Sequence, residues 1–134
     1  MIKDLPDNKV ENIGIAVILE EETSTYKVWN VYIINFKKIP ISTVLVSSKG
    51  YGTFKGDEVK TSVLRHALGD MDANSYAFVE AIDDKLFAIN NEYLVSYYID
   101  GTIYDKKFIF LTESITEFNF IRVPLINKPG VLIA

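Results

Sequence analysis

The dipeptide Asp100-Gly101 constrains the fold more than any other feature of this sequence. It separates two segments, 92–99 and 102–110, that are rich in aromatic and β-branched residues. A two-residue Asp-Gly link favours a type I′ turn, because the twist of that turn matches the right-handed twist of the flanking strands. We therefore predict a β-hairpin over residues 92–110.

The register of this hairpin assigns its residues to two faces. Tyr97 lies opposite Tyr104 and Tyr93 lies opposite Phe108, so these aromatic side chains share one face. Aromatic pairs of this kind stabilise a hairpin by a few tenths to about 1 kcal/mol each. We assign the aromatic face to the core. The other face carries the polar side chains Ser96, Asp105 and Lys107.

The other apolar segments also follow the two-residue period of strands rather than the period of a helix. Segment 27–35 is apolar on both faces, which is typical of a strand in the centre of a sheet or under a second layer. Segment 61–68 fits a strand or one helical turn, and we prefer the strand. Pro124 indicates that the last strand is an edge strand. The strands predicted besides the hairpin are 13–19, 27–35, 41–48, 61–68, 75–82 and 120–126.

Seven to eight short strands without a helix-length pattern predict an all-β fold. The number and spacing of the strands favour a two-sheet antiparallel β-sandwich of immunoglobulin-like kind, with a small β-barrel as the alternative. Residues 1–12 are predicted to form a flexible N-terminal arm and residues 13–134 a single domain. A chain of 134 residues buries about two-thirds of its unfolded surface, which is sufficient for a core.

Two segments near the C-terminus carry apolar residues outside the regular pattern. Segment 112–119 is polar, and Ile115 and Phe118 are its predicted hydrophobic anchors. The apolar tail 131–134 has two interpretations of equal weight. The tail is an edge strand or anchor of its own domain, or it adds to a sheet edge in this molecule or in another.

Composition narrows the class of partner. A net charge of −4 argues against a general binder of nucleic acid or of anionic membranes. Residues 27–65 nevertheless carry a net charge of +5, which becomes a basic surface only if these residues share one face. The mean hydropathy of +0.13 leaves room for an exposed apolar patch. The absence of cysteine, of a leader-like N-terminus and of an apolar run of membrane-spanning length predicts a cytoplasmic protein.

Residues 47–56 form a glycine-rich segment that invites comparison with phosphate-binding loops. Backbone amides at glycine, with lysine beside them, can hold an anion. The segment lacks the Gly-Lys-Ser/Thr step of a P-loop, so the alternative of a mobile loop or wide hairpin tip stays open. The candidate ligand-binding residues here and just beyond are Lys49, Tyr51, Phe54, Lys55, Lys60, Arg65 and His66.

His66 is the single histidine, and Asp70 and Asp72 are the nearby carboxylates that can orient it as a base. No nucleophile motif accompanies it, since the chain has no Gly-x-Ser-x-Gly elbow. On a strand His66 shares a face with Leu64 and Leu68, which favours a position at the edge of the core. We therefore assign no catalytic residue.

Residues 70–74 copy the first half of a calcium-binding loop. Ser75 and Ala81 stand where such a loop needs glycine and a bidentate glutamate, so we interpret the segment as a turn. One histidine and no cysteine do not support a zinc site. We predict no metal and no cofactor.

Three stretches of the chain are Trp29-Asn30-Val31-Tyr32-Ile33-Ile34-Asn35, Val44-Leu45-Val46-Ser47-Ser48-Lys49-Gly50-Tyr51 and Lys60-Thr61-Ser62-Val63-Leu64-Arg65-His66-Ala67-Leu68-Gly69. These stretches resemble a family of short, uncharacterised proteins of Bacteroidetes, some of which are labelled phenylalanyl-tRNA synthetase alpha subunit. The chain is too short for a synthetase catalytic domain and has no ATP-binding motif. The resemblance therefore implies a compact domain with no catalytic residues to transfer.

Three functional hypotheses follow from the sequence. The leading one is a non-enzymatic β-sandwich that binds a protein partner or forms a homo-oligomer. The second is a binder of an anionic ligand, such as a nucleotide or single-stranded RNA, through segment 47–65, although the net charge disfavours nucleic acid in general. The third is a small enzyme that uses His66 with Asp70 or Asp72.

Overall fold

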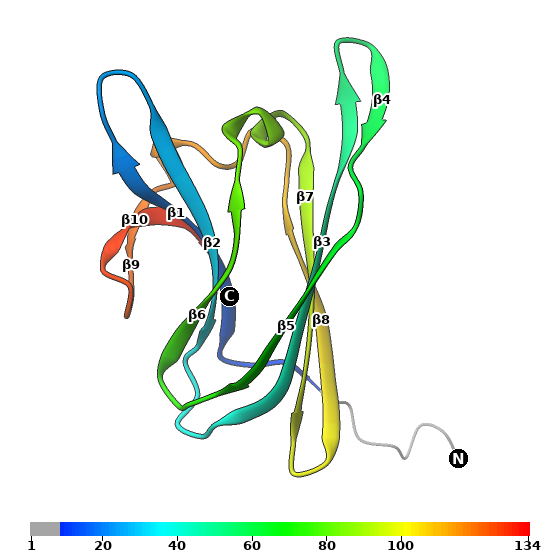
Figure 1. The fold of residues 1–134 in the computed structure, drawn as a ribbon, viewed down its shortest axis with the longest axis vertical. Coiled ribbons are helices and arrows are strands. Elements are labelled where there is room, and N and C mark those ends of the chain that lie inside the picture. The colour runs from blue at the N-terminus through cyan, green and yellow to red at the C-terminus, as the bar shows by residue number, and fades with distance from the viewer. Residues whose placement is uncertain (1–8) are drawn as a thin grey trace.

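A computed structural model describes residues 9–134. Within these residues ten strands form two antiparallel sheets that pack face to face, as the sequence predicted for a β-sandwich (Figure 1). The two sheets are separate, so the alternative of a small barrel is wrong. Residues 1–8 of the predicted N-terminal arm lie outside the described residues.

The first sheet, sheet A, has the strand order β6-β2-β1-β10-β9. Strand β2 lies inside this sheet, between β1 and β6, in agreement with its two apolar faces. Strand β9 is the edge strand before Pro124, but it is shorter than predicted. The bounds are β1 Ile13–Glu22, β2 Lys27–Asn35, β6 Ser75–Ile82, β9 Ile121–Val123 and β10 Lys128–Ile133.

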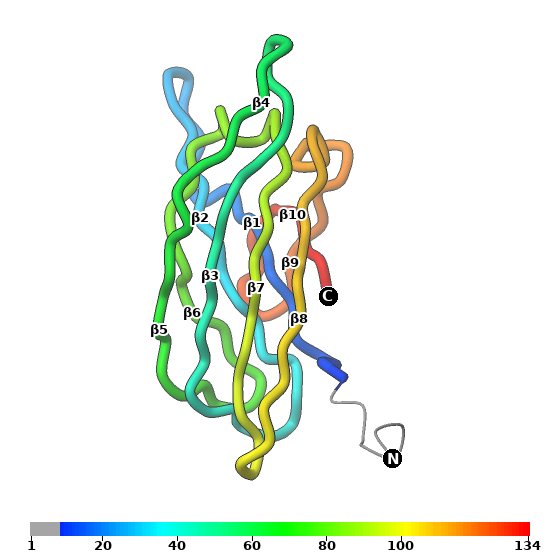
Figure 2. The backbone as a smooth tube through the Cα atoms, turned by 90° about the vertical axis from the view of Figure 1, so that its right-hand side faces the viewer, coloured from blue at the N-terminus to red at the C-terminus, as the bar shows by residue number. Residues whose placement is uncertain are grey.

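The second sheet, sheet B, has the order β4-β3-β7-β8, and β5 also pairs with β3. Strands β4 and β5 pair with the two halves of the long β3, so together they form one interrupted edge (Figure 2). The interpretation of segment 61–68 as a strand is confirmed, although β5 starts three residues later. The bounds are β3 Ile41–Phe54, β4 Asp57–Lys60, β5 Leu64–Met71, β7 Asn90–Ile99 and β8 Thr102–Phe110.

The predicted hairpin around Asp100-Gly101 is confirmed in position and register. Both turn residues have positive φ, 49° and 77°, as a type I′ turn requires. Tyr97 pairs with Tyr104, and their rings stack with centroids 5.4 Å apart. Tyr93 pairs with Phe108, and both side chains are buried in the main core.

The C-terminal tail is neither an edge strand nor a free segment for another molecule. Val131, Leu132 and Ile133 belong to β10, which pairs with β1 on one side and with β9 on the other. A Cβ atom at Gly130 would overlap the carbonyl oxygen of Val17, so only glycine allows β10 to approach β1 this closely. The tail therefore anchors its own domain and adds to a sheet of this molecule, as one part of each interpretation expected, but it lies inside sheet A rather than at its edge.

One of the two predicted anchors in segment 112–119 is wrong. Ile115 is buried, as predicted, but Phe118 is 96% exposed. Phe118 lies in the short 3-10 helix η3, Glu117–Asn119, whereas Phe120 packs against Trp29 with ring centroids 5.8 Å apart. The anchor of this connection is therefore Phe120, two residues further along the chain.

Candidate functional site

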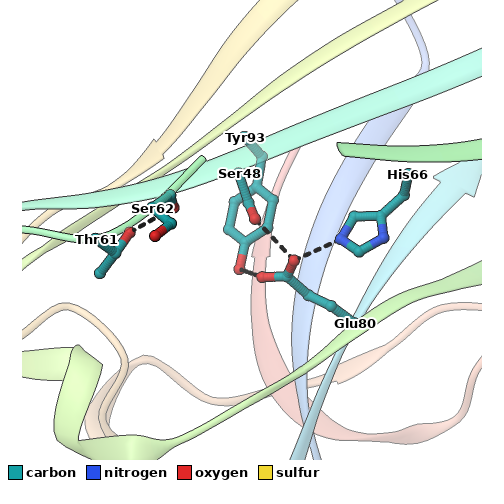
Figure 3. A network of polar contacts seen from close by, with 6 residues as sticks. All are labelled: Ser48, Thr61, Ser62, His66, Glu80 and Tyr93. Atoms are coloured by element: carbon teal, nitrogen blue, oxygen red, sulfur yellow. Dashed lines mark hydrogen bonds and ion pairs between the residues drawn. The ribbon is translucent and has the colours of Figure 1, made fainter. Parts of the chain in front are cut away.

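A largely buried carboxylate, Glu80, is the centre of a polar cluster that joins the two sheets. Glu80 comes from β6 in sheet A, whereas its partners Ser48, His66 and Tyr93 come from β3, β5 and β7 in sheet B. Figure 3 shows these three side chains pointing toward the carboxylate. The side chain of Glu80 is only 12% exposed. A buried charge of this kind needs hydrogen bonds to offset its lost hydration.

Each oxygen of Glu80 accepts a hydrogen bond. Ser48 Oγ donates to Glu80 Oε1 over 2.7 Å, and His66 Nε2 lies 2.7 Å from the same oxygen. Tyr93 OH donates to Glu80 Oε2 over 3.1 Å. Burial, followed by the charge of Glu80, raises the pKa of Tyr93 well above its ordinary value, so the phenol stays protonated and remains a donor.

A β-bulge in β6 turns Glu80 toward the core. Simple alternation would place Glu80 on the outer face of sheet A with Tyr76 and Phe78, which are exposed. The pairing with β2 shifts by one residue between Val31 and Tyr32, so Glu80 lies opposite the buried Val31. Sequence reasoning missed Glu80 because nothing in the local sequence marks this bulge.

A small cavity of about 160 Å³ adjoins the cluster. Ser48, Glu80 and Tyr93 form its polar side. Thr61 and Ser62 lie on its rim, and the Thr61 hydroxyl donates to the Ser62 carbonyl over 3.0 Å (Figure 3). A cavity of this volume has room for a few water molecules or a small polar molecule.

The order of hydrogen bonds in the cluster differs from that of a nucleophile–base pair. In such a pair the hydroxyl donates to the histidine, which is oriented by the carboxylate. Here Ser48 donates to Glu80, and the carboxylate lies between serine and histidine. The cluster can bind a polar group, but in this arrangement His66 does not activate Ser48.

The carboxylate that contacts His66 is Glu80, and not Asp70 or Asp72 as the sequence suggested. Asp70 instead accepts a hydrogen bond from the backbone N–H of Thr43 over 3.1 Å, at an irregularity in β3. The carbonyl of Asp72 accepts from Asn35 Nδ2 over 2.9 Å. Asp70 and Asp72 therefore stabilise local backbone geometry. Within residues 9–134 no group of three or more acidic or histidine side chains is placed to hold a metal ion.

The predicted ligand-binding residues do not form one site. They are divided among the outer face of sheet B, the β3–β4 hairpin and the polar cluster. Lys49 and Tyr51 lie on the outer face of sheet B, where both contact Glu92, at 3.6 and 3.4 Å. Lys55 lies over the Phe54 ring at the tip of the β3–β4 hairpin. Lys60 is in β4, Arg65 is exposed on β5, and only His66 reaches the polar cluster.

The glycine-rich segment forms regular strand and a tight turn rather than a loop. Lys55 and Gly56 have positive φ, 52° and 84°, and connect β3 to β4. A Cβ at Gly50 would lie 2.9 Å from the Ile89 side chain, so this glycine permits close packing of β3 over Ile89. Packing and turn geometry account for both glycines without a bound phosphate.

The outer face of sheet B carries a diagonal line of exposed aliphatic side chains, which we call the outer stripe: Leu45, Leu94 and Ile109. They come from β3, β7 and β8, and they are 46%, 40% and 37% exposed. Leu45 pairs with Ser96 and Ile109 pairs with Glu92, the residues two positions either side of Leu94. Diagonal neighbours of this kind are within side-chain reach.

A shallow hollow of about 330 Å³ lies beside the outer stripe. Its apolar lining comes from Leu45, Leu94 and Ala67, and the short side chains of Ser47 and Ser96 leave the space open. Arg65 is the charged residue of the lining and has no carboxylate partner within residues 9–134.

Comparison of the chain with models of known protein families, with curated protein sequences and with solved structures gives no match. In the part of the chain that the structure describes, no helix is long and apolar enough to cross a membrane.

Proposed function

We propose that this protein is a non-enzymatic, cytoplasmic protein-interaction module with an immunoglobulin-like sandwich, and that its binding surface is the outer face of sheet B. The observation that carries the proposal is the outer stripe together with its hollow. Single exposed aliphatic residues are common on protein surfaces, but a continuous line of them across three strands favours a contact surface.

The chemistry of this face defines the partner. An aliphatic or aromatic side chain seated in the hollow would cover Leu45 and Leu94 and lose its contact with water. A carboxylate beside that side chain would pair with Arg65, which lines the same hollow. The proposed partner is therefore an acidic protein segment with a large apolar residue.

A second candidate is the binding of an anionic small molecule or single-stranded RNA on the same face. Arg65 supports it, since no carboxylate neutralises its guanidinium within the described chain. Lys49 weighs against it, because Glu92 already pairs with this lysine. The other predicted basic residues, Lys55 and Lys60, belong to the β3–β4 hairpin, away from this hollow. The enzymatic hypothesis has less support, since His66 contacts Glu80 and neither Asp70 nor Asp72.

Selection of phage-displayed peptides on the purified protein tests the main proposal. We expect enriched peptides to combine a large apolar residue with Asp or Glu, and Leu94→Glu to weaken their binding at least about tenfold, since a carboxylate would repel them. Phe78→Glu is the matched control, because Phe78 is also exposed, 51% against 40% for Leu94, but lies on the outer face of sheet A.

The results of these binding experiments distinguish the protein-interaction function from the binding of an anionic ligand. Enriched peptides without acidic residues, or peptides that bind Leu94→Glu as well as the natural chain, would contradict the proposal. Salt-sensitive retention of single-stranded RNA or a nucleotide that is lost in Arg65→Ala would favour the second candidate.

A further inference from the structure

An apolar groove lies at one end of the sandwich, remote from the outer stripe. This end groove has a volume of about 490 Å³ and lies between the β3–β4 hairpin and the 3-10 helix η2, Asp84–Ala88. Figure 1 shows the hairpin extending beyond the rest of the sandwich at this end. Its apolar lining comes from Phe54 and Val59 of the hairpin and from Leu86, Phe87 and Ile89.

The most exposed large apolar side chain of the described residues belongs to the same end. Phe118 is 96% exposed, and the connection that carries it runs along η2, since the N–H of Glu113 donates to the carbonyl of Phe87 over 2.9 Å. Glu113 also lines the end groove. The connection that carries the exposed ring therefore starts at the groove, and both features belong to the same end of the sandwich.

Hydrogen bonds hold the turn that presents Phe118. The N–H of Asn119 donates to Thr116 over 2.9 Å, and Asn119 Nδ2 donates to the Ser114 carbonyl over 2.8 Å. The turn ends at Phe120, which packs on Trp29. A ring presented by an ordered turn loses little conformational freedom when it is buried, which favours its use as a contact.

We propose that two copies of this chain associate end to end, with Phe118 of each copy seated in the end groove of the other. A cavity of about 150 Å³ is enough for benzene, so the groove has room for a phenyl ring. Because the exposed apolar group and the apolar groove belong to one end of the same chain, a two-fold axis at that end allows both contacts at once and makes the contact isologous.

The charges around the contact are compatible with this arrangement. Lys60 and Lys85 lie on the rim of the groove beside Asp84 and Glu113. Glu117 precedes Phe118 and reaches the rim of the other copy together with the ring. Neither lysine has a carboxylate partner within residues 9–134, so each can pair with Glu117 of the second copy.

Sedimentation velocity at low and high protein concentration tests this contact. The end of the sandwich is narrow, so we expect a weak dimer with a dissociation constant of roughly micromolar order. Phe118→Ser should weaken the dimer at least about tenfold. Val59→Glu should weaken it similarly, because it places a carboxylate in the groove. Both residues are exposed, so both variants should fold, and Phe78→Ser should associate like the natural chain.

Mixing the two variants tests reciprocity. Phe118→Ser keeps an intact groove and Val59→Glu keeps an intact ring, so the mixture should recover one of the two contacts and associate more tightly than either variant alone. A monomer at every concentration, oligomers longer than two, or a dimer that Phe118→Ser leaves unchanged would overturn the proposal. None of these outcomes bears on the outer stripe, whose residues are different.

Discussion

At the scale of single residues, Glu20 shows how the exterior of sheet A is organised. Its carboxylate accepts hydrogen bonds from the Tyr32 hydroxyl and from Lys128 Nζ, so it links β1 to β2 and β10. Partial burial alone would raise the pKa of Glu20, but the hydrogen bonds from Lys128, Tyr32 and Asn30 outweigh it and hold the pKa below its ordinary value.

We predict that Glu20 contributes to the acid sensitivity of the fold. A carboxylate whose pKa is lower in the folded state stabilises the protein above its unfolded pKa, and this contribution is lost as the pH falls through the folded value. Glu20→Gln should therefore lose less unfolding free energy than the natural chain between neutral pH and pH of about 3. Urea denaturation at a series of pH values measures this, with the exposed Glu58→Gln as control. Equal losses in both proteins would contradict the prediction.

At the scale of elements, β10 shows how a short tail can be essential. Val131 and Ile133 pack in the main core, and β10 is hydrogen-bonded on both sides within sheet A. Removing β10 would expose β9 and the buried face of β1 at once, because β9 pairs with the sheet only through β10.

We predict that deletion of residues 131–134 abolishes stable folding. Val131 is buried and Leu132 and Ile133 are partly buried. Full burial of such a side chain contributes about 1.5–3 kcal/mol and partial burial less, whereas natural domains have total stabilities of only about 5–15 kcal/mol. Deletion of the exposed Ala134 alone is the control and should leave the melting temperature unchanged. Circular dichroism on heating compares the two. A truncated chain that melts like the natural one would place the tail outside the cooperative fold.

At the scale of the whole molecule, the Glu80 cluster provides hydrogen bonds between the two sheets, whose shared core consists of apolar side chains. Loss of the carboxylate leaves the buried Tyr93 hydroxyl and the Ser48 hydroxyl without their acceptor. Buried donors without partners are costly, whereas the loss of an exposed hydrogen bond is not.

We predict that Glu80→Ala lowers the unfolding free energy by about 3 kcal/mol, within the range for buried hydrogen bonds to a charged group. Glu80→Gln should lose less, since the amide oxygen still accepts one or two of these bonds. Tyr93→Phe in the Glu80→Ala background should then cost little, because it removes the unpaired hydroxyl. Chemical denaturation of the natural chain, Glu80→Ala, Tyr93→Phe and the double variant measures the coupling, and additive losses would show that the pair does not interact.

The local strand patterns are the part of this protein that its sequence determined by itself. The turn at Asp100-Gly101, the register of Tyr97 with Tyr104 and the interior position of β2 follow from neighbouring residues, because twist and alternation are local properties. Tertiary structure alone decided the rest. Glu80 faces the core because pairing with β2 introduces a bulge, and β10 is interior because β1, from the N-terminal part of the chain, pairs with the side that its neighbour β9 leaves free. These outcomes depend on contacts between distant segments, for which no local pattern exists.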